Sequence, residues 1–253
     1  MIDLHCHLLP GVDDGPPDEA ATFAIARAQV AAGVDKALCT PHAGHGYPGN
    51  TGQAIIDATA ALRTRLADEG IPLRVQAGAE VALSRAIELP DEELTLFHLG
   101  ASDWLLLEPP LSTDVPRLEA LVQGLQTRGH KILIAHPERC AAFHHDPKLL
   151  GELVRNGALA QITAGSLAGQ FGRTVAKLAR TMVDEGVAHV VASDAHDAER
   201  RAPGLAGPLA EAGLEWFTEW ACHDVPLAML AGDPIPPRPE PARGQRRSLL
   251  RRR

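Results

Sequence analysis

Short apolar runs alternate along the chain with segments of helical periodicity. Seven runs rich in Val, Ile or Leu have the length and composition of buried parallel strands. They are Ile2–His5, Val34–Thr40, Arg74–Val81, Trp104–Glu108, Ile132–His136, Leu159–Thr163 and Val187–Asp194. Between them, apolar residues recur at helical spacing over 115–125 and 175–183, and Asp18, Asp114 and Asp146 stand where helix N-caps belong. These strand–helix units predict an α/β fold whose parallel strands close into a barrel.

Charge divides the chain into two regions at residue 232. The 253 residues include 24 Lys and Arg against 32 Asp and Glu, a formal net charge of −8. Residues 233–253 hold seven arginines, five prolines and two carboxylates, a net charge of +5, which leaves −13 on residues 1–232. We therefore expect one folded domain over 1–232 and a disordered, Pro/Arg-rich tail over 233–253. A solvated appendage is the first expectation for this tail, and contact with an acidic partner or a membrane surface is the alternative.

Composition argues against several classes of protein. The apolar runs are too short to cross a membrane, and polar sequence from Asp3 onward predicts no signal peptide. The four cysteines stand singly, without a CxxC pair, which predicts a reducing, cytoplasmic location. An acidic chain with only 4% aromatic residues is a poor candidate for nucleic-acid binding.

The ends of the predicted strands hold the candidate metal ligands. Six of the seven ends have a His, Asp or Glu, and in a parallel barrel such ends converge on one face. His5 and His7 alone could equally be a structural pair, but Glu80 and Glu108 end apolar runs and need a partner that a cation would supply. Nine candidate ligands are too many for one tetrahedral ion and suggest two or three cations. They are His5, His7, Asp14, His42, Glu80, Glu108, His136, Asp194 and His196.

The sequence lacks the cysteine–arginine pair of a cysteine-dependent phosphatase. A cysteine-dependent tyrosine phosphatase needs an Arg six positions after the nucleophile, so that one loop closes around the phosphate. The residues six positions after the four cysteines are Val12, His45, Asp146 and Ala228. A GxxxxGK loop and a Rossmann fingerprint are also missing from the sequence.

The strand-end motifs together resemble a known family. They are HxHxLPGxDDG at 5–15, TPH at 40–42, GAEV at 78–81, LLLEPP at 105–110, AHPER at 135–139, QITAGSLAGQFG at 161–172 and SDAH at 193–196. In this order they resemble the polymerase and histidinol phosphatase (PHP) superfamily. Within it, they are similar to the bacterial tyrosine-protein phosphatases of capsular and exopolysaccharide loci. The resemblance implies a distorted seven-stranded, TIM-like (β/α)7 barrel with a trinuclear centre, of manganese first and of iron or zinc as alternatives.

The resemblance also implies roles for individual residues. It places one cation on His5, His7, Glu80 and Asp194, a second on Glu80, Glu108 and His136, and a third on Asp14, His42 and His196. The choice of Asp14 over Asp13 rests on the resemblance alone. Arg139 and Arg201 match the arginines that such enzymes use to hold the phosphate, whereas Cys140 and Ala82 depart from the family pattern.

The implied activity is hydrolysis of phosphotyrosine on the autophosphorylating tyrosine kinase of polysaccharide export. The hypothesis for the reaction is attack on phosphorus by a hydroxide that bridges two cations. One alternative is a phosphoesterase acting on a small phosphate monoester such as histidinol phosphate. An amidohydrolase-like enzyme would usually have a strand-end Lys, which this sequence lacks. A noncatalytic regulator is disfavoured because all nine candidate ligands are present.

Overall fold

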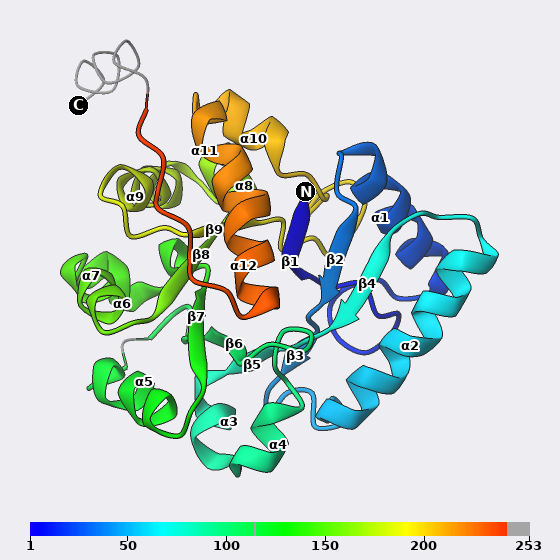
Figure 1. Cartoon of the computed structure of the whole chain (residues 1–253), viewed down its shortest axis with the longest axis horizontal. Helices are drawn as coiled ribbons and strands as arrows, with labels where there is room; N and C mark the ends of the chain where they lie inside the picture. Colours follow the sequence, from blue (N-terminus) through cyan, green and yellow to red (C-terminus); the bar gives the residue numbers. More distant parts are fainter. Residues whose placement is uncertain (114, 242–253) are drawn as a thin grey trace.

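The structure, a computed structural model, describes residues 1–113 and 115–241 as parallel strands surrounded by helices (Figure 1). The strands are β1 (Ile2–Cys6), β2 (Lys36–Cys39), β3 (His42–Ala43), β4 (Arg74–Ala77), β5 (Glu80–Ala82), β6 (Trp104–Glu108), β7 (Lys131–Ala135), β8 (Leu159–Thr163) and β9 (Val190–Ala192). The first helices are α1 (Glu19–Ala31), α2 (Gly52–Asp68), α3 (Leu83–Glu88), α4 (Asp91–Thr95), α5 (Leu118–Thr127), α6 (Ala141–His145) and α7 (Lys148–Arg155). They are followed by α8 (Ala164–Leu167), α9 (Arg173–Asp184), α10 (Ala206–Glu211), α11 (Glu215–Glu219) and α12 (Val225–Ala231). A 3₁₀ turn covers Pro137–Arg139, and one turn of π-helix covers Trp220–Asp224.

The strands pair in parallel, which confirms the predicted α/β class. Their order is β1-β2-β4 in one sheet and β3-β5-β6-β7-β8-β9 in the other. Strands such as β6 and β8 are almost wholly buried, as expected for parallel strands with both faces covered. Figure 1 shows α1 and α2 beside the smaller sheet, and α3, α5 and α7 beside the larger one. A single closed barrel, as predicted, is not shown, because the hydrogen-bond ladders of the described residues divide into two sheets.

The division coincides with a break within one predicted strand and a gap directly after another. The predicted run Arg74–Val81 is interrupted at Gly78, between β4 and β5. A Cβ at Gly78 would lie 2.9 Å from Cδ2 of Leu99 and 3.3 Å from Cγ2 of Thr40, so the backbone passes too close to its neighbours for a larger residue. Pro41, which has no N–H to donate to a ladder, lies in the corresponding gap between β2 and β3.

The first and last strands meet where the candidate ligands lie. The Asp194 N–H donates to the carbonyl of His5 and the His7 N–H donates to the carbonyl of Ala195, both at 2.9 Å. Cys6 and Ala195 form an isolated parallel bridge. Asp3 strengthens this junction, because its buried carboxylate accepts the backbone N–H of Ser193 at 3.0 Å. The loop after β9 is therefore fixed against the end of β1.

Two of the predicted helices and one cap are confirmed directly. The periodic segments at 115–125 and 175–183 correspond to α5 and α9, which bury Leu118, Val122 and Leu125 and Ala179, Met182 and Val183. Asp18 caps α1 by accepting the Ala21 N–H at 2.9 Å. The N-cap of α7 is Pro147, so the cap predicted at Asp146 is wrong by one residue, although Asp146 accepts the Lys148 N–H at 3.0 Å. The third predicted cap, Asp114, lies outside the described residues.

The first residues of the predicted tail lie against the folded body. Arg238 donates to the carbonyl of Val183, and its guanidinium lies over the rings of Trp216 and Phe217, 5.4 and 5.3 Å from their centroids. The Nε1 of Trp220 donates to the carbonyl of Pro236 at 3.0 Å. Residues 242–253 lie outside the described residues, so the boundary at residue 232 stays a prediction. Among the described residues, no helix combines the length and hydropathy that a membrane crossing requires.

Candidate metal centre

The nine predicted ligands come together at one end of the parallel strands. His5 lies in β1, His7 directly after it, Glu108 at the end of β6, His136 after β7, Asp14 in the loop before α1, and Asp194 and His196 after β9. His42 and Glu80 are instead the first residues of β3 and β5, and they are Cα partners in the ladder between those strands. The gap after the second predicted strand and the break within the third thus place this pair beside the others.

Glu80 is the centre of the cluster. Its side chain is fully buried and faces four imidazoles. Its Oε2 lies 2.9 Å from Nδ1 of His42, 3.2 Å from Nε2 of His5 and 3.4 Å from Nε2 of His7. Its Oε1 lies 2.6 Å from Nε2 of His136. One carboxylate surrounded in this way has the arrangement of a bridging ligand.

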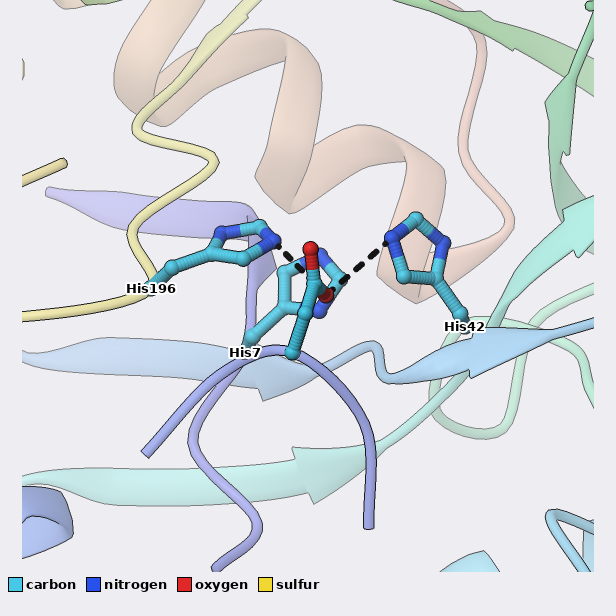
Figure 2. A group of neighbouring side chains, drawn as sticks. His7, His42 and His196 are labelled. Carbon is cyan, nitrogen blue, oxygen red and sulfur yellow. Dashed lines mark ion pairs between the residues drawn. The ribbon is translucent and has the colours of Figure 1, made fainter. Parts of the chain in front are cut away.

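Asp14 organises a second group on the exposed side of the cluster. Its Oδ1 lies 3.3 Å from Nε2 of His196 and 3.4 Å from Nε2 of His42. Figure 2 shows His196 and His42 on opposite sides of this group, with the ring of His7 between them. One ligand atom from each of these four residues lies within 4.8 Å of the others. The Asp14 side chain is 50% exposed, so solvent reaches the cluster here.

Glu108 and Asp194 complete the set. Glu108 Oε2 lies 3.8 Å from Nδ1 of His42, and its Oε1 lies 3.9 Å from Nε2 of His136. Asp194 Oδ1 lies 3.4 Å from Nε2 of His5. The structure therefore brings all nine predicted ligands into one continuous cluster.

Both predicted arginines lie at the cluster as well. Arg201 contacts Oδ2 of Asp194 at 2.7 Å, and Arg139 forms an ion pair with the same oxygen. The Arg139 guanidinium also lies 4.5 Å from the centroid of the Phe171 ring. Asp194 thus faces the histidines with one oxygen and the two arginines with the other.

The electrostatics of the cluster are those of excess negative charge. Burial lowers the pKa of His5, but Glu80 and Asp194 outweigh it and raise this pKa to about 9. Burial also lowers the pKa of His42, but Asp14 and Glu80 outweigh it and raise this pKa to about 11. Burial and the nearby charge of Glu80 raise the pKa of Glu108. The carboxylates of the cluster therefore favour positive charge close to them, which bound cations would supply.

Two residues that orient the histidines were not predicted as such. Asp13 Oδ2 lies 2.7 Å from Nδ1 of His7 and accepts the His42 N–H at 3.0 Å. Gln161 Oε1 lies 2.9 Å from Nδ1 of His5. Each contact leaves the Nε2 of its histidine directed at the cluster, as in metal sites whose ligands are held from behind. The DDG step marked Asp13 as an alternative ligand, and Gln161 is a polar residue inside the apolar run Leu159–Thr163.

Backbone strain is present at two of the candidate ligands. His136 has φ 30° and Asp194 has φ 52°, both in the left-handed region that non-glycine residues seldom adopt. His136 is followed by the turn that carries Arg139, whose N–H donates to the His136 carbonyl at 2.9 Å. Strained residues of this kind cluster at functional sites.

The residues present fit divalent cations. Glu80 Oε2, Asp194 Oδ1 and His196 Nε2 are buried and make no hydrogen bond of acceptable geometry to any other described atom. Buried polar atoms are nearly always satisfied, so these three require a further partner. Imidazole nitrogens with carboxylate oxygens are donors suited to zinc, iron and manganese. A separate group of Glu219, His223 and Asp224 lies at the surface and contains none of the predicted ligands.

The cysteines do not offer an alternative nucleophile. All four are buried, and burial raises the pKa of Cys6 well above its ordinary value and that of Cys39 to about 12. Thiols of this kind stay protonated at neutral pH, whereas the reactive species is the thiolate. This agrees with the missing Arg six positions after each cysteine.

A parallel α/β fold with histidines and carboxylates gathered at the strand ends is typical of metal-dependent hydrolases. The family described as capsular polysaccharide synthesis, CpsB/CapC, matches residues 1–212. The chain belongs to this family, which confirms the resemblance read from the motifs. It is 40% identical to the tyrosine-protein phosphatase YwqE of Bacillus subtilis over 202 residues, 79% of each chain. It is 34% identical to the putative tyrosine-protein phosphatase CapC of Staphylococcus aureus, also over 202 residues and 79% of each chain.

The fold is also similar to that of a solved relative. The crystal structures in question are of YwqE from Bacillus subtilis and CpsB from Streptococcus pneumoniae, described as unique metal-dependent tyrosine phosphatases. The match has a TM-score of 0.84 at 35% identity and covers 96% of this chain and 100% of that chain.

Proposed function

We propose that this protein is a metal-dependent protein-tyrosine phosphatase. The observation that carries the proposal is the cluster around Glu80, with two arginines beside it on Asp194. The relatives named as tyrosine-protein phosphatases support the same activity.

The proposed centre holds two or three divalent cations, of manganese first and of iron or zinc as alternatives. His5, His7, Glu80 and Asp194 would hold one, Glu80, Glu108 and His136 a second, and Asp14, His42 and His196 a third. When bound, such ions lower the pKa of water enough to supply a nucleophile near neutral pH and stabilise charge on a phosphate. The three unsatisfied buried atoms of Glu80, Asp194 and His196 support this assignment.

The protein's own residues would bind and orient the phosphate. Arg139 and Arg201 present guanidinium groups, whose paired N–H donors match phosphate oxygens. Asp194 holds both groups at the edge of the cluster, and the ring of Phe171 supports Arg139. The leaving group is a phenolate whose parent phenol has a pKa of about 10, so it departs with little help from a general acid.

We further propose that the substrate is a phosphotyrosine on the kinase of polysaccharide export, in the cytoplasm. Membership of a capsular polysaccharide family supports the partner, and four buried free cysteines fit a reducing compartment. We also propose that the two sheets act together as a distorted barrel. The backbone hydrogen bonds between the end of β1 and the loop after β9 support that arrangement.

A substrate panel with metal analysis tests the activity. The metal content of the purified protein would be measured, and hydrolysis compared for a phosphotyrosine peptide, histidinol phosphate and a phosphodiester. The expected result is bound divalent metal and preference for the peptide. Preference for histidinol phosphate would favour the small-monoester alternative.

Site variants with a matched control test the residues. Glu108→Ala and His136→Ala are expected to abolish turnover, whereas Glu92→Ala, at an exposed position of α4, should retain it. Unchanged activity in both site variants would overturn the proposed centre.

A further inference from the structure

Tyr47, the only tyrosine of the chain, lies beside the candidate metal centre. Its ring is nearly parallel to the imidazole of His42, with an angle of 9° between the planes and 5.6 Å between the centroids. His42 is the residue that faces Glu80 with Nδ1 and Asp14 with Nε2. Because Tyr47 is only partly buried, its ring forms part of the rim of the cluster.

The segment that carries Tyr47 is fixed by its backbone. The Tyr47 N–H donates to the Gly44 carbonyl, and the Asn50 N–H donates to the Tyr47 carbonyl, both at 3.0 Å. The Asn50 side-chain amide donates to the carbonyl of His42 at 2.8 Å and to that of Val12 at 3.1 Å. The backbone at residue 47 is thus held by contacts that a substitution of the Tyr47 side chain leaves in place.

The phenol ring of Tyr47 presents an aromatic surface next to a strongly charged cluster, because one face of the ring lies along the imidazole of His42.

The two other partly exposed aromatic rings of the described residues each lie under an arginine, whereas Tyr47 lies against a candidate ligand. Phe171 lies under the guanidinium of Arg139, and Trp216 lies under that of Arg238. The remaining phenylalanines and tryptophans are buried in the core: Phe23, Phe97, Phe143, Phe217, Trp104 and Trp220. Tyr47 is consequently the ring best placed to meet an aromatic group that enters with a phosphate.

We propose, building on the proposed function, that Tyr47 contacts the phenyl ring of the substrate and favours aryl phosphates over alkyl phosphates. A phosphate seated on the cluster carries its ester group toward the exposed side, where Tyr47 and Asp14 lie. Aromatic rings attract one another at centroid separations of about 4.5–7 Å, and such a pair changes affinity by about two- to tenfold. An alkyl phosphate of the same charge has no ring with which to make this contact.

Binding of two phosphonates tests the proposal without requiring turnover. Phenylphosphonate and methylphosphonate, which are not hydrolysed, would be titrated calorimetrically into the manganese-loaded wild type, Tyr47→Leu and Tyr47→Phe. Tyr47→Leu is expected to weaken phenylphosphonate binding by about two- to tenfold and to leave methylphosphonate binding unchanged. Tyr47→Phe keeps the ring and should bind both ligands like the wild type. Thermal melting of each variant verifies that it is folded.

The outcomes separate this inference from the proposed function. Equal weakening of both ligands in Tyr47→Leu, or unchanged binding of both, would overturn the role of Tyr47. Failure of the wild type to bind phenylphosphonate would also overturn the role of Tyr47. Selective weakening together with no hydrolysis of a phosphotyrosine peptide would overturn the phosphatase activity and support the aryl contact.

Discussion

Oδ2 of Asp13 lies 2.7 Å from Nδ1 of His7, and this contact determines which nitrogen of the ring faces the cluster. Because Nδ1 is engaged by a carboxylate, Nε2 is the nitrogen left for a cation, and it lies 3.4 Å from Oε2 of Glu80. The Asp13 side chain is 1% exposed and that of Asp14 is 50% exposed. The two neighbouring carboxylates therefore have different tasks: Asp13 positions an imidazole, and Asp14 faces the open side of the cluster.

We predict that substitutions of these two residues differ in kind. Asp13→Ala should keep the number of bound cations and weaken their affinity by about 10- to 100-fold, because the imidazole loses the group that orients it. Asp14→Ala should lower the number of bound cations by one. Competition with a fluorescent chelator measures the affinity, and elemental analysis measures the number. Loss of a cation in Asp13→Ala with none in Asp14→Ala would reverse the assignment.

Glu80→Gln should disable the whole centre. The amide keeps the size of the side chain and removes the negative charge that faces four imidazoles, so a bridging ligand is lost. We expect kcat on a phosphotyrosine peptide to fall by about a thousandfold or more, in line with the loss of electrostatic stabilisation in other enzymes. Glu92→Gln is the matched control at an exposed position. A fall of less than tenfold in folded Glu80→Gln would contradict the central role of Glu80.

Divalent cations should stabilise the folded protein. A ligand that binds only the folded state at 100 times its Kd adds about 2.7 kcal/mol, which for a domain of this size raises Tm by about 5–10 °C. The measurement compares thermal unfolding in a chelator and in excess Mn²⁺. Glu80→Gln should show little of this shift. An equal rise in Tm in the wild type and in Glu80→Gln would indicate that Mn²⁺ binds away from the Glu80 cluster.

Arg139→Lys should raise KM more than it lowers kcat. Lysine keeps the positive charge but loses the planar pair of donors and the contact with the Phe171 ring. One charge-assisted hydrogen bond contributes about 1.5–3 kcal/mol, so we expect KM to rise by about tenfold or more. Steady-state kinetics on a phosphotyrosine peptide measures both constants. An unchanged KM would remove Arg139 from the phosphate-binding site.

Much of the site could be predicted because strong local patterns determine where strands end. The apolar runs before His136, Glu108 and Asp194 identify strands that the structure confirms. Parallel pairing then brings these ends together, whatever their separation in the sequence.

The parts that sequence could not predict depend on tertiary contacts. At Gly78, where the predicted strand breaks, a Cβ would lie 2.9 Å from Cδ2 of Leu99, a residue from a different segment. Gln161 has its functional partner, His5, 156 positions away in the sequence, and a glutamine inside a strand carries no local sign of this. Asp13 and Asp14 are adjacent and chemically identical, so only the direction of each side chain separates their roles.

His189 gives the structure a pH dependence that is independent of the metal centre. It lies before β9, where its Nδ1 is 3.4 Å from the Ala160 N–H and its ring is 6.2 Å from that of Trp220. Burial, with a further contribution from the charge of Arg238, lowers its pKa to about 4. The unfolded chain, with a histidine pKa of about 6.5, therefore binds a proton first as the pH falls. The stabilising effect of neutral His189 is complete above about pH 6.5 and is lost as the pH falls toward 4.

We expect His189→Gln to remove this dependence. Between pH 7 and pH 5, protonation of this one residue should cost the wild type about 2 kcal/mol of unfolding free energy that the variant does not lose. Urea unfolding of both proteins at the two pH values, in a chelator because metal binding also depends on pH, measures the difference. Equal losses in the two proteins would show that His189 binds its proton as readily in the folded state as in the unfolded chain.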